Sequence, residues 1–323
     1  MKAIDRIIGA LKSSKRSVIT AHVNLEGDSL GSQLAMANLL KCLGKKPVII
    51  DDDEVPEIYR FLPGAKLVRH VSDYNNEKFD TAIVLDCPNL RRTGRVKGIV
   101  EKAKQVINID HHVSNEGFGN LIWVEKNASS VGEMIYTLFK ELSCEITKET
   151  ALYLYISILT DTGSFNYSNT SGATHRIVSE LLGCGIEPYE VSKRVYENKT
   201  LGEIRLLAKV LSGLNVTADG RIAYIAVRKE DLEHTKTRPV SCENFVNFAR
   251  SIKGVEVAVF FRENISKKGL LNVSFRSSGN VDVNNIAASF GGGGHKNASG
   301  CVIEGQFEGI KKRVLNRISD EFK

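Results

Sequence analysis

The sequence predicts an α/β protein in which an N-terminal domain with a parallel sheet is joined by a helical connector to a smaller α+β domain. Three observations predict this class. The chain of 323 residues is long enough to bury two hydrophobic cores. Short apolar runs alternate with stretches of helical periodicity up to about residue 110, as in the strand-helix-strand units of a parallel sheet, and from Ser129 to about residue 182 the pattern is helical. Glycine and proline then break the pattern at Gly183, Gly185 and Pro188.

We therefore place the first domain at residues 1–186, the helical connector at 187–214 and the second domain at 215–323. In the first domain, apolar residues at helical spacing predict a helix over 3–11, and a helix from Leu34 to Leu43 stops at Gly44. The remaining expected elements are strands at 18–21, 46–50, 82–85 and 106–110, a basic helix-like stretch at 91–104, and helices at 131–139, 151–159 and 174–182.

The second domain has a different pattern of elements, because the expected strands and helices do not alternate regularly. We expect strands at 221–227, 255–261, 270–275 and 300–303, and helices at 242–251, 283–290 and 307–318. This mixture is typical of an α+β domain.

The composition favours a globular protein of the cytoplasm. Hydrophobic residues make up 42% of the chain, and 44 Lys and Arg against 38 Asp and Glu give a formal net charge of +6. This mild excess suits anionic ligands but does not indicate a protein that coats DNA. Residues 1–15 mix charges with apolar residues, so we expect neither a signal peptide nor a membrane span there. The six cysteines lack Cys-x-x-Cys spacing, so reduced thiols are expected rather than a disulfide framework or a cysteine zinc site.

Three of the expected strands end in side chains that can bind metal ions. The first strand runs into His22, the third runs into Asp86, and the fourth ends in Asp110, which His111 and His112 follow. In an open α/β sheet the ligand site lies outside the carboxyl ends of the strands. We therefore expect these strand ends to converge on one active site.

Three more acidic residues belong to the same candidate site. Glu26 and Asp28 lie just beyond the first strand, and Asp161 lies at the exit of a helix, where the helix dipole disfavours an acidic side chain and a cation would stabilise it. Five carboxylates in one crevice would repel one another unless some are protonated or divalent cations neutralise them. The mixture of oxygen and imidazole ligands favours manganese, iron or zinc over calcium, and its oxygen-rich balance favours manganese. This many ligands indicate two ions, bridged by a carboxylate for phosphoryl chemistry.

Any one of these residues taken alone is more often a cap or turn residue than a metal ligand. The inference depends on their coincidence at three strand ends. His70, His175 and His234 have no such neighbours in the sequence, and we expect them to be surface or packing residues.

A glycine-rich segment in the second domain predicts an anion-binding turn. Residues 291–294 are all glycine and precede His295 and Lys296, so the backbone can approach a ligand and turn its N–H groups toward an anion. The segment is not a P-loop, because His295 stands where a glycine must precede the lysine. A flexible linker is the alternative interpretation. Arg262 and the turn at 276–278 add donors that could clamp phosphate, although either arginine is equally well an ordinary surface charge.

These residues resemble the DHH/DHHA1 phosphoesterase family, named for triplets such as Asp110-His111-His112, and are most similar to its bacterial nanoRNase and pAp phosphatase group. The resemblance extends over nearly the whole chain. It rests on the order and spacing of motifs at residues 22–32, 85–86, 110–112, 127–132, 159–165, 274–277 and 291–300. It implies an N-terminal DHH catalytic domain and a C-terminal DHHA1 substrate-binding domain.

The resemblance also implies a role for each matching residue. It assigns one manganese ion to His22, Glu26 and Asp86, and the other to Asp28, Asp86, His111 and Asp161, with Asp86 as the bridge. Asp110 would orient the neighbouring imidazole, and His112 would face the scissile phosphate. The catalytic residues implied are therefore Asp86, Asp110 and His112. The substrate-binding residues implied in the second domain are Arg276, Ser277, Gly292, Gly293, Gly294 and His295.

One position departs from the family pattern, because Leu25-Glu26 stands where the family usually has Pro-Asp. Glutamate can still bind a metal ion. Its extra methylene group shifts the carboxylate, however, which could alter the metal preference or slow turnover.

The expected function is that of a manganese-dependent, two-metal phosphoesterase that degrades short oligoribonucleotides to mononucleotides and dephosphorylates adenosine 3′,5′-bisphosphate (pAp). Two alternatives stay open: a phosphodiesterase for cyclic dinucleotides or linear products such as pApA, and a nucleotide-binding protein that has lost catalysis. The glycine-rich segment disfavours inorganic pyrophosphatase. The expected cofactors are two Mn²⁺ ions, with Mg²⁺ or Co²⁺ as alternatives. The expected partners are short RNA, pAp or dinucleotides as substrates and no membrane, with a homodimer left open.

Overall fold

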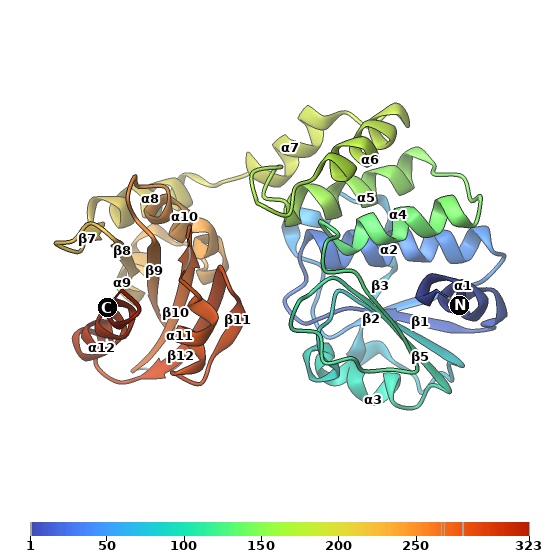
Figure 1. Cartoon of the computed structure of the whole chain (residues 1–323), viewed down its shortest axis with the longest axis horizontal. Helices are drawn as coiled ribbons and strands as arrows, with labels where there is room; N and C mark the ends of the chain where they lie inside the picture. Colours follow the sequence, from blue (N-terminus) through green and yellow to red (C-terminus); the bar gives the residue numbers. More distant parts are fainter. Residues whose placement is uncertain (1, 266, 268, 280, 323) are drawn as a thin grey trace. The chain divides into compact units, whose positions relative to one another are not determined.

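The computed structural model describes residues 2–265, 267, 269–279 and 281–322, without the side chains of residues 240, 241, 243 and 295. The chain divides into two compact units, Met1–Asn198 and Lys199–Lys323 (Figure 1). Within the described ranges, no helix is both long enough and apolar enough to cross a membrane.

The first unit is built on a parallel sheet of six strands. The strands are β1 (Ser17–Thr20), β2 (Val48–Asp51), β3 (Val68–His70), β4 (Thr81–Leu85), β5 (Gln105–Asp110) and β6 (Leu121–Val124). They lie in the order β3-β2-β1-β4-β5-β6. The chain moves outward in one direction from β1 and in the other direction from β4. The order therefore reverses between β1 and β4, and the carboxyl ends of strands at such a reversal are where ligands bind in open α/β sheets.

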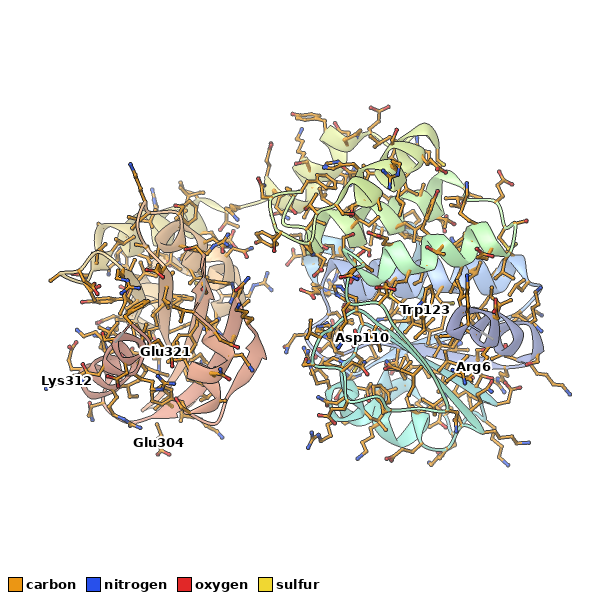
Figure 2. The ribbon with its side chains drawn as sticks, in the orientation of Figure 1. Arg6, Asp110, Trp123, Glu304, Lys312 and Glu321 are labelled. Carbon is orange, nitrogen blue, oxygen red and sulfur yellow. A yellow bond between two sulfur atoms is a disulfide. The ribbon has the colours of Figure 1, made fainter. Side chains whose placement is uncertain are left out.

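Helices cover both faces of this sheet (Figure 1). One face packs against α1 (Ala3–Ser13), α2 (Gly27–Cys42), α4 (Val131–Glu141) and α5 (Lys148–Asp161), and the other against the 3₁₀ segment η4 (Leu90–Val96) and α3 (Lys97–Val100). Strand residues alternate between the two cores, with Ile19 and Ile83 in the first and Val18 and Ala82 in the second. Trp123 on β6 packs on the first core, beside the helix that carries Arg6 (Figure 2).

The remaining elements of this unit are short or lie outside the sheet layers. They are the 3₁₀ segments η1 (Glu57–Tyr59), η2 (Pro63–Leu67) and η3 (Val71–Asp73), and the helices α6 (Gly172–Gly183) and α7 (Pro188–Tyr196).

Two glycines let α2 and α5 approach each other closely. A Cβ on Gly27 would collide with the side chain of Thr160, and a Cβ on Gly31 would collide with the backbone oxygen of Tyr153. These glycines are four residues apart and share one face of α2. Because the helices run this close together, the first turn of α2 lies beside the last turn of α5, where Asp161 is the final residue.

The second unit contains a mixed sheet in the order β11-β12-β10-β9-β8-β7. The strands are β7 (Asn215–Val216), β8 (Ile222–Val227), β9 (Val257–Glu263), β10 (Leu270–Ser277), β11 (Gly293–His295) and β12 (Ala298–Glu304). One face packs against α8 (Leu201–Ser212), α9 (Lys229–Thr235), η5 (Pro239–Phe245) and α10 (Val246–Arg250), and the other against α11 (Val283–Ala288) and α12 (Phe307–Asp320).

The predicted fold class, a parallel-sheet domain followed by a smaller mixed domain, is confirmed. Several details differ. The expected basic helix at 91–104 is largely a 3₁₀ segment, since Gly94 adopts a φ of 59° that interrupts helical geometry. Sequence reasoning did not predict β3, which is short and lacks an apolar run, and it also missed β6, although Leu121–Val124 is an apolar run of four residues. The glycine-rich segment contributes the edge strand β11.

The expectation of reduced thiols is wrong for two of the cysteines. Cys42 and Cys144 form a disulfide across 102 residues of sequence, with their Cα atoms 6.2 Å apart. Cys42 is the last residue of α2 and Cys144 lies just beyond α4, so the bridge follows from the packing of two helices. No local spacing could have indicated it. Cys87, Cys184, Cys242 and Cys301 are not part of a disulfide among the described residues.

Candidate metal centre

The carboxyl ends of β1, β4 and β5 meet in the first unit, at the edge where the strand order reverses. His22 lies two residues beyond β1, and Asp86 directly follows β4. Asp110, which is labelled in Figure 2, is the last residue of β5. The first turn of α2 supplies Asp28, and the end of α5 supplies Asp161. Side chains far apart in the sequence thus reach one buried cluster.

Asp86 lies at the centre of this cluster and is only 1% exposed. Its φ of 51° is in the left-handed region, where non-glycine residues are strained and concentrate at functional sites. Its Oδ2 is 3.3 Å from Nε2 of His22, whereas Oδ1 is 3.7 Å from Nε2 of His111 and 3.5 Å from Nδ1 of His112. Among the described residues, Oδ2 has no hydrogen-bond partner of good geometry. A buried carboxylate oxygen without such a partner is unfavourable, and a cation beside it would relieve this.

His22 and Glu26 complete the first group around Asp86. One possible ligand atom from each of the three residues lies within 4.8 Å of the others. Nδ1 of His22 donates to the carbonyl oxygen of Val23 at 2.7 Å, so Nε2 is turned toward the carboxylates and is 3.6 Å from Oε1 of Glu26. Burial alone would lower the pKa of His22, but the charges of Asp86 and Glu26 raise this pKa to about 11.

Asp28, His111 and Asp161 form a second group with the same spacing. Nε2 of His111 is 3.7 Å from Oδ2 of Asp28 and 3.6 Å from Oδ2 of Asp161. Its Nδ1 donates to the carbonyl oxygen of Ala128 at 3.2 Å, which fixes the ring as Val23 fixes that of His22. Burial opposes protonation of His111, but the charges of Asp161, Asp28 and Asp86 raise its pKa to about 9.

Donors from three helices hold Asp28 in place. Its Oδ1 accepts hydrogen bonds from Oγ of Ser157 at 2.6 Å and Oγ of Ser32 at 2.8 Å, and its Oδ2 accepts the N–H of Val131 at 2.9 Å. Burial and the charge of Asp86 nevertheless raise the pKa of Asp28 to about 6. Burial also raises the pKa of Asp161 well above its usual range. The cluster therefore retains protons that a bound cation would displace.

Asp110 and His112 form a separate pair at the edge of the cluster. Nδ1 of His112 donates to Oδ1 of Asp110 at 2.7 Å, and Nδ2 of Asn115 donates to Oδ2 of Asp110 at 2.6 Å. Burial opposes ionisation of Asp110, but His112 and Asn115 outweigh it and lower the pKa of this carboxyl. Asp110 thus stays ionised and fixes the orientation of the His112 ring. His112 also forms a third close group with Asp86 and His111.

The structure brings together all eight residues that the sequence placed at this site: His22, Glu26, Asp28, Asp86, Asp110, His111, His112 and Asp161. Their donor set of carboxylates and imidazoles fits divalent cations. The two oxygens of Asp86 face different groups, as a bridging carboxylate requires.

Comparisons with known proteins place the chain in a family. Residues 16–158 match the model of the DHH family, N-terminal domain, and residues 219–323 match that of the DHHA1 domain. A Thermus thermophilus protein named bifunctional oligoribonuclease and PAP phosphatase NrnA is 34% identical over 94% of this chain and 89% of its own length. The chain belongs to the DHH/DHHA1 family. The resemblance seen in the sequence is therefore confirmed.

Two further relatives extend this likeness of the DHH and DHHA1 domains. A Bacillus subtilis protein of the same name is 28% identical over 88% of each chain. The crystal structure of an exopolyphosphatase-related protein from Bacteroides fragilis superposes with a TM-score of 0.93, at 30% identity, over 98% of this chain and 96% of that chain. The family architecture therefore spans nearly the whole chain.

The DHHA1 domain contains the other residues that the sequence assigned to substrate binding. Arg276 and Ser277 end β10, where the Ser277 side chain is buried and accepts the N–H of Gly279 at 3.3 Å. Gly292 lies so close to β12 that a Cβ would collide with the backbone oxygen of Gly300. Gly293 and Gly294 pair with β12 in the edge strand β11, and the side chain of His295 lies outside the described part of the structure. Nη1 of Arg262 donates to the carbonyl oxygen of Pro239 at 2.6 Å.

Sequence reasoning missed the residues that position the acidic side chains of this cluster. Ser157 and Asn115 hold Asp28 and Asp110, and Nδ2 of Asn169 contacts the side chain of Asp161 at 3.3 Å. Ser157 is a buried polar residue within an apolar helix. A polar residue in such a run needs a hydrogen-bond partner, and this was the one signal in the sequence. Asn115 and Asn169 lie in irregular segments without any periodic pattern.

Two of the three isolated histidines lie away from the cluster in local contacts. His70 hydrogen-bonds the Ser72 hydroxyl, and the ring of His175 lies 5.5 Å from that of Phe165.

Proposed function

We propose that the protein is a manganese-dependent phosphoesterase that degrades short oligoribonucleotides to mononucleotides and removes a phosphate from pAp. Family membership makes the chain a hydrolase of the phosphoesterase class. The proposed substrates follow the names of the Thermus thermophilus and Bacillus subtilis relatives. A third relative, from Streptococcus mutans, is named as a probable protein of the same kind and is 26% identical over 93% of this chain.

The geometry of Asp86 is the observation that carries this proposal. One buried carboxylate, with a strained backbone, presents its two oxygens to two different sets of imidazoles. We propose that His22, Glu26 and Asp86 hold one ion, and that Asp28, Asp86, His111 and Asp161 hold the other. The oxygen-rich donor set favours manganese, with magnesium or cobalt as substitutes. Two divalent cations held there would neutralise charge on a phosphoryl group and activate water for in-line displacement.

The chain's own residues would orient the substrate and handle protons around the reacting phosphate. Asp110 accepts the proton of His112 Nδ1 and fixes the ring, which we propose to present to the scissile phosphate. Asn115 in turn holds the Asp110 carboxylate, so the pair is set before substrate arrives. In the DHHA1 domain, we propose that Arg276, Ser277, Gly292, Gly293, Gly294 and His295 contribute the contacts to the rest of the nucleotide.

Hydrolysis of pApA and of pAp, measured in parallel, tests this function. The full-length protein is assayed with Mn²⁺, with excess chelator, and as the Asp86→Asn variant, with Asp73→Asn as a matched control on an exposed acid outside the cluster. We expect Mn²⁺-dependent cleavage of both substrates, its loss with chelator or Asp86→Asn, and no effect of Asp73→Asn.

Other outcomes would replace the proposal. Cleavage of pApA alone would favour the turnover of signalling dinucleotides. Retained metal without cleavage of either substrate would indicate a nucleotide-binding protein that has lost catalysis. Cleavage that survives chelation would rule out the two-metal mechanism.

A further inference from the structure

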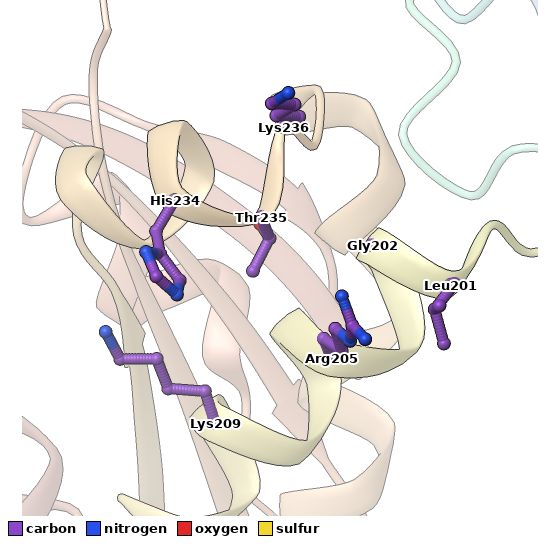
Figure 3. A pocket seen from close by; sticks show the side chains of 7 residues that line it. All are labelled: Leu201, Gly202, Arg205, Lys209, His234, Thr235 and Lys236. Atoms are coloured by element: carbon purple, nitrogen blue, oxygen red, sulfur yellow. The ribbon is translucent and has the colours of Figure 1, made fainter.

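A cavity of about 520 Å³ lies within the second unit, between α8, which precedes the residues matched to the DHHA1 domain, and the end of α9 (Figure 3). The α8 side of its wall consists of Leu201, Gly202, Arg205 and Lys209, and the α9 side consists of His234, Thr235 and Lys236. Its size falls in the range of small-molecule sites, about 300 to 1,000 Å³. None of these residues belongs to the proposed metal centre or to the proposed substrate contacts.

The wall of this cavity is strongly cationic. Arg205, Lys209 and Lys236 are exposed, and among the described residues neither Arg205 nor Lys236 forms an ion pair. Lys209 alone has an acidic partner, since its Nζ is 2.5 Å from Oδ1 of Asp231. Asp231 raises the pKa of Lys209, with a smaller effect of Glu230. The cavity therefore keeps an excess of positive charge.

The other nearby acids are engaged elsewhere. Glu203 on α8 accepts the N–H of Thr200 at 2.6 Å and closes the capping box of that helix. On α9, Oε1 of Glu233 is 3.7 Å from Nζ of Lys229. Among the residues that the structure describes, neither contact pairs an acid with Arg205 or Lys236, so the charge of these two side chains is not neutralised by an ion pair there.

Helix electrostatics explain only part of this charge. Cations at the C-terminal end of a helix stabilise its dipole, which accounts for Lys236 and His234 at the end of α9. Arg205 is not explained in this way, because it lies in the second turn of α8 and not at the C-terminal end of a helix. Arg205 and Lys209 are four residues apart and share one face of α8. Figure 3 shows His234 and Thr235 extending from α9 toward this face.

The two helices that form the cavity wall pack into the hydrophobic core of the second unit. A Cβ on Gly202 would collide with the backbone oxygen of Thr235, so the two helices touch at the level of their backbones. Buried Leu206 and Val210 of α8 and Leu232 of α9 share one hydrophobic cluster with the sheet. The cationic side chains therefore extend from two helices whose separation is fixed by packing.

We propose that this cavity binds the phosphate group of a nucleotide. Arginine presents a planar fork that matches phosphate oxygens, and lysine adds a point charge. Leu201, which is 64% exposed, supplies an apolar wall for a sugar or base. Recognition of phosphate follows from the cavity itself, whereas the choice of a nucleotide rests on the proposed function. The nucleotide is either a free mononucleotide or a residue within an RNA chain.

The imidazole of His234 provides a reporter inside the cavity. In full-length protein labelled with ¹⁵N-histidine and kept in chelator to prevent hydrolysis, the ring signals of His234 are identified by their loss in His234→Gln. The protein is titrated separately with inorganic phosphate, AMP and a 5′-phosphorylated RNA pentamer. We expect saturable shifts of the His234 signals. Arg205→Gln and Lys236→Gln should each weaken the apparent affinity by about 10-fold, the effect of losing one charge-assisted hydrogen bond. Lys312→Gln, an equal change of charge on α12, should not.

The three ligands distinguish the sources of the phosphate. Saturation by AMP supports a mononucleotide site, and saturation by the RNA pentamer alone supports a site for a phosphate within RNA. The proposal is overturned if no ligand shifts His234, if the shifts never saturate, or if Arg205→Gln and Lys236→Gln bind as tightly as the Lys312→Gln control. The Asp86→Asn variant separates this proposal from the proposed function: it should abolish hydrolysis but keep the His234 titration.

Discussion

The proposed metal centre of the first unit and the cationic cavity of the second unit are both charged, but they are built in opposite ways. In the metal centre, Asp86 and Asp110 are buried, and hydrogen bonds from serine, asparagine or backbone groups fix the side chains around them. In the cavity, Arg205 and Lys236 are exposed and only the helices beneath them are fixed. The first arrangement sets its geometry in advance, whereas the second adjusts to its ligand and contributes mainly charge.

The largest expected effect is on the metal centre. Asp86→Asn keeps the shape of the side chain but removes the charge that both ligand groups share, so we expect both ions to be lost together. The fall in hydrolysis should exceed the roughly 10- to 100-fold loss typical when a residue that only supports a ligand is changed. Bound Mn²⁺, measured per chain after gel filtration, checks this. Retention of one full equivalent would show that the two groups bind independently and that Asp86 is not their bridge.

Asp51 tests whether burial alone raises an acid's pKa at this sheet edge. Asp51 ends β2 and is 2% exposed, and its Oδ1 accepts from Oγ1 of Thr20 at 3.0 Å and from the N–H of Ala21 at 3.2 Å. Burial raises the pKa of Asp51 from its usual value of 3.8 to about 6. The folded protein then holds this proton more tightly than the unfolded chain does. The wild type should lose stability as the pH rises from about 4 to 6, with nothing lost below that window.

Asp51→Asn removes this titration. The free energy of unfolding of both proteins is measured with urea, in chelator, at pH 4 and at pH 7.5. Relative to the wild type, the variant should be more stable at pH 7.5 than at pH 4, by at most roughly 3 kcal/mol at 1.36 kcal/mol per pKa unit. The other titrating groups contribute equally to the stability of both proteins, so they cancel in the difference between variant and wild type. A difference that is the same at both pH values would contradict the raised pKa and would leave the metal cluster as the one place at this edge where acids are perturbed.

A smaller effect is expected one step away from the proposed metal ligands. Asp110→Asn keeps every proposed ligand but replaces the charge that orients His112, so hydrolysis should fall by roughly 10- to 100-fold. Bound Mn²⁺ should not change. Asn115→Ala should lower activity in the same direction but less, since it removes only the donor to Asp110. Loss of Mn²⁺ from Asp110→Asn would make Asp110 a ligand instead of a positioning residue.

The same contrast explains what the sequence could predict. The metal centre follows from strand ends, because a parallel sheet must bring the residues after β1, β4 and β5 to one edge. Ser157, Asn115 and the Cys42–Cys144 bridge depend on how helices and loops pack, which no local pattern encodes. The cavity is harder still, since Arg205 and Lys236 look like any exposed basic residues until α8 and α9 are placed together.

The smallest expected effect is at Glu26, the one position of the metal centre that resembles the cavity residues in its exposure. The Glu26 side chain is 56% exposed and its Oε1 is 3.6 Å from Nε2 of His22, so this edge of the centre is open to adjustment. Glu26→Asp restores the residue that the family usually has there. Hydrolysis of pApA with Mn²⁺ and with Mg²⁺ should therefore match or exceed the wild type, with a change of less than about 10-fold, or 1.4 kcal/mol. Glu26→Gln, which keeps the length but removes the charge, is the control and should lower activity. A large loss in Glu26→Asp would mean that the loop before α2 is built around the longer side chain, and the metal centre would then be preorganised at its exposed edge as well as in its interior.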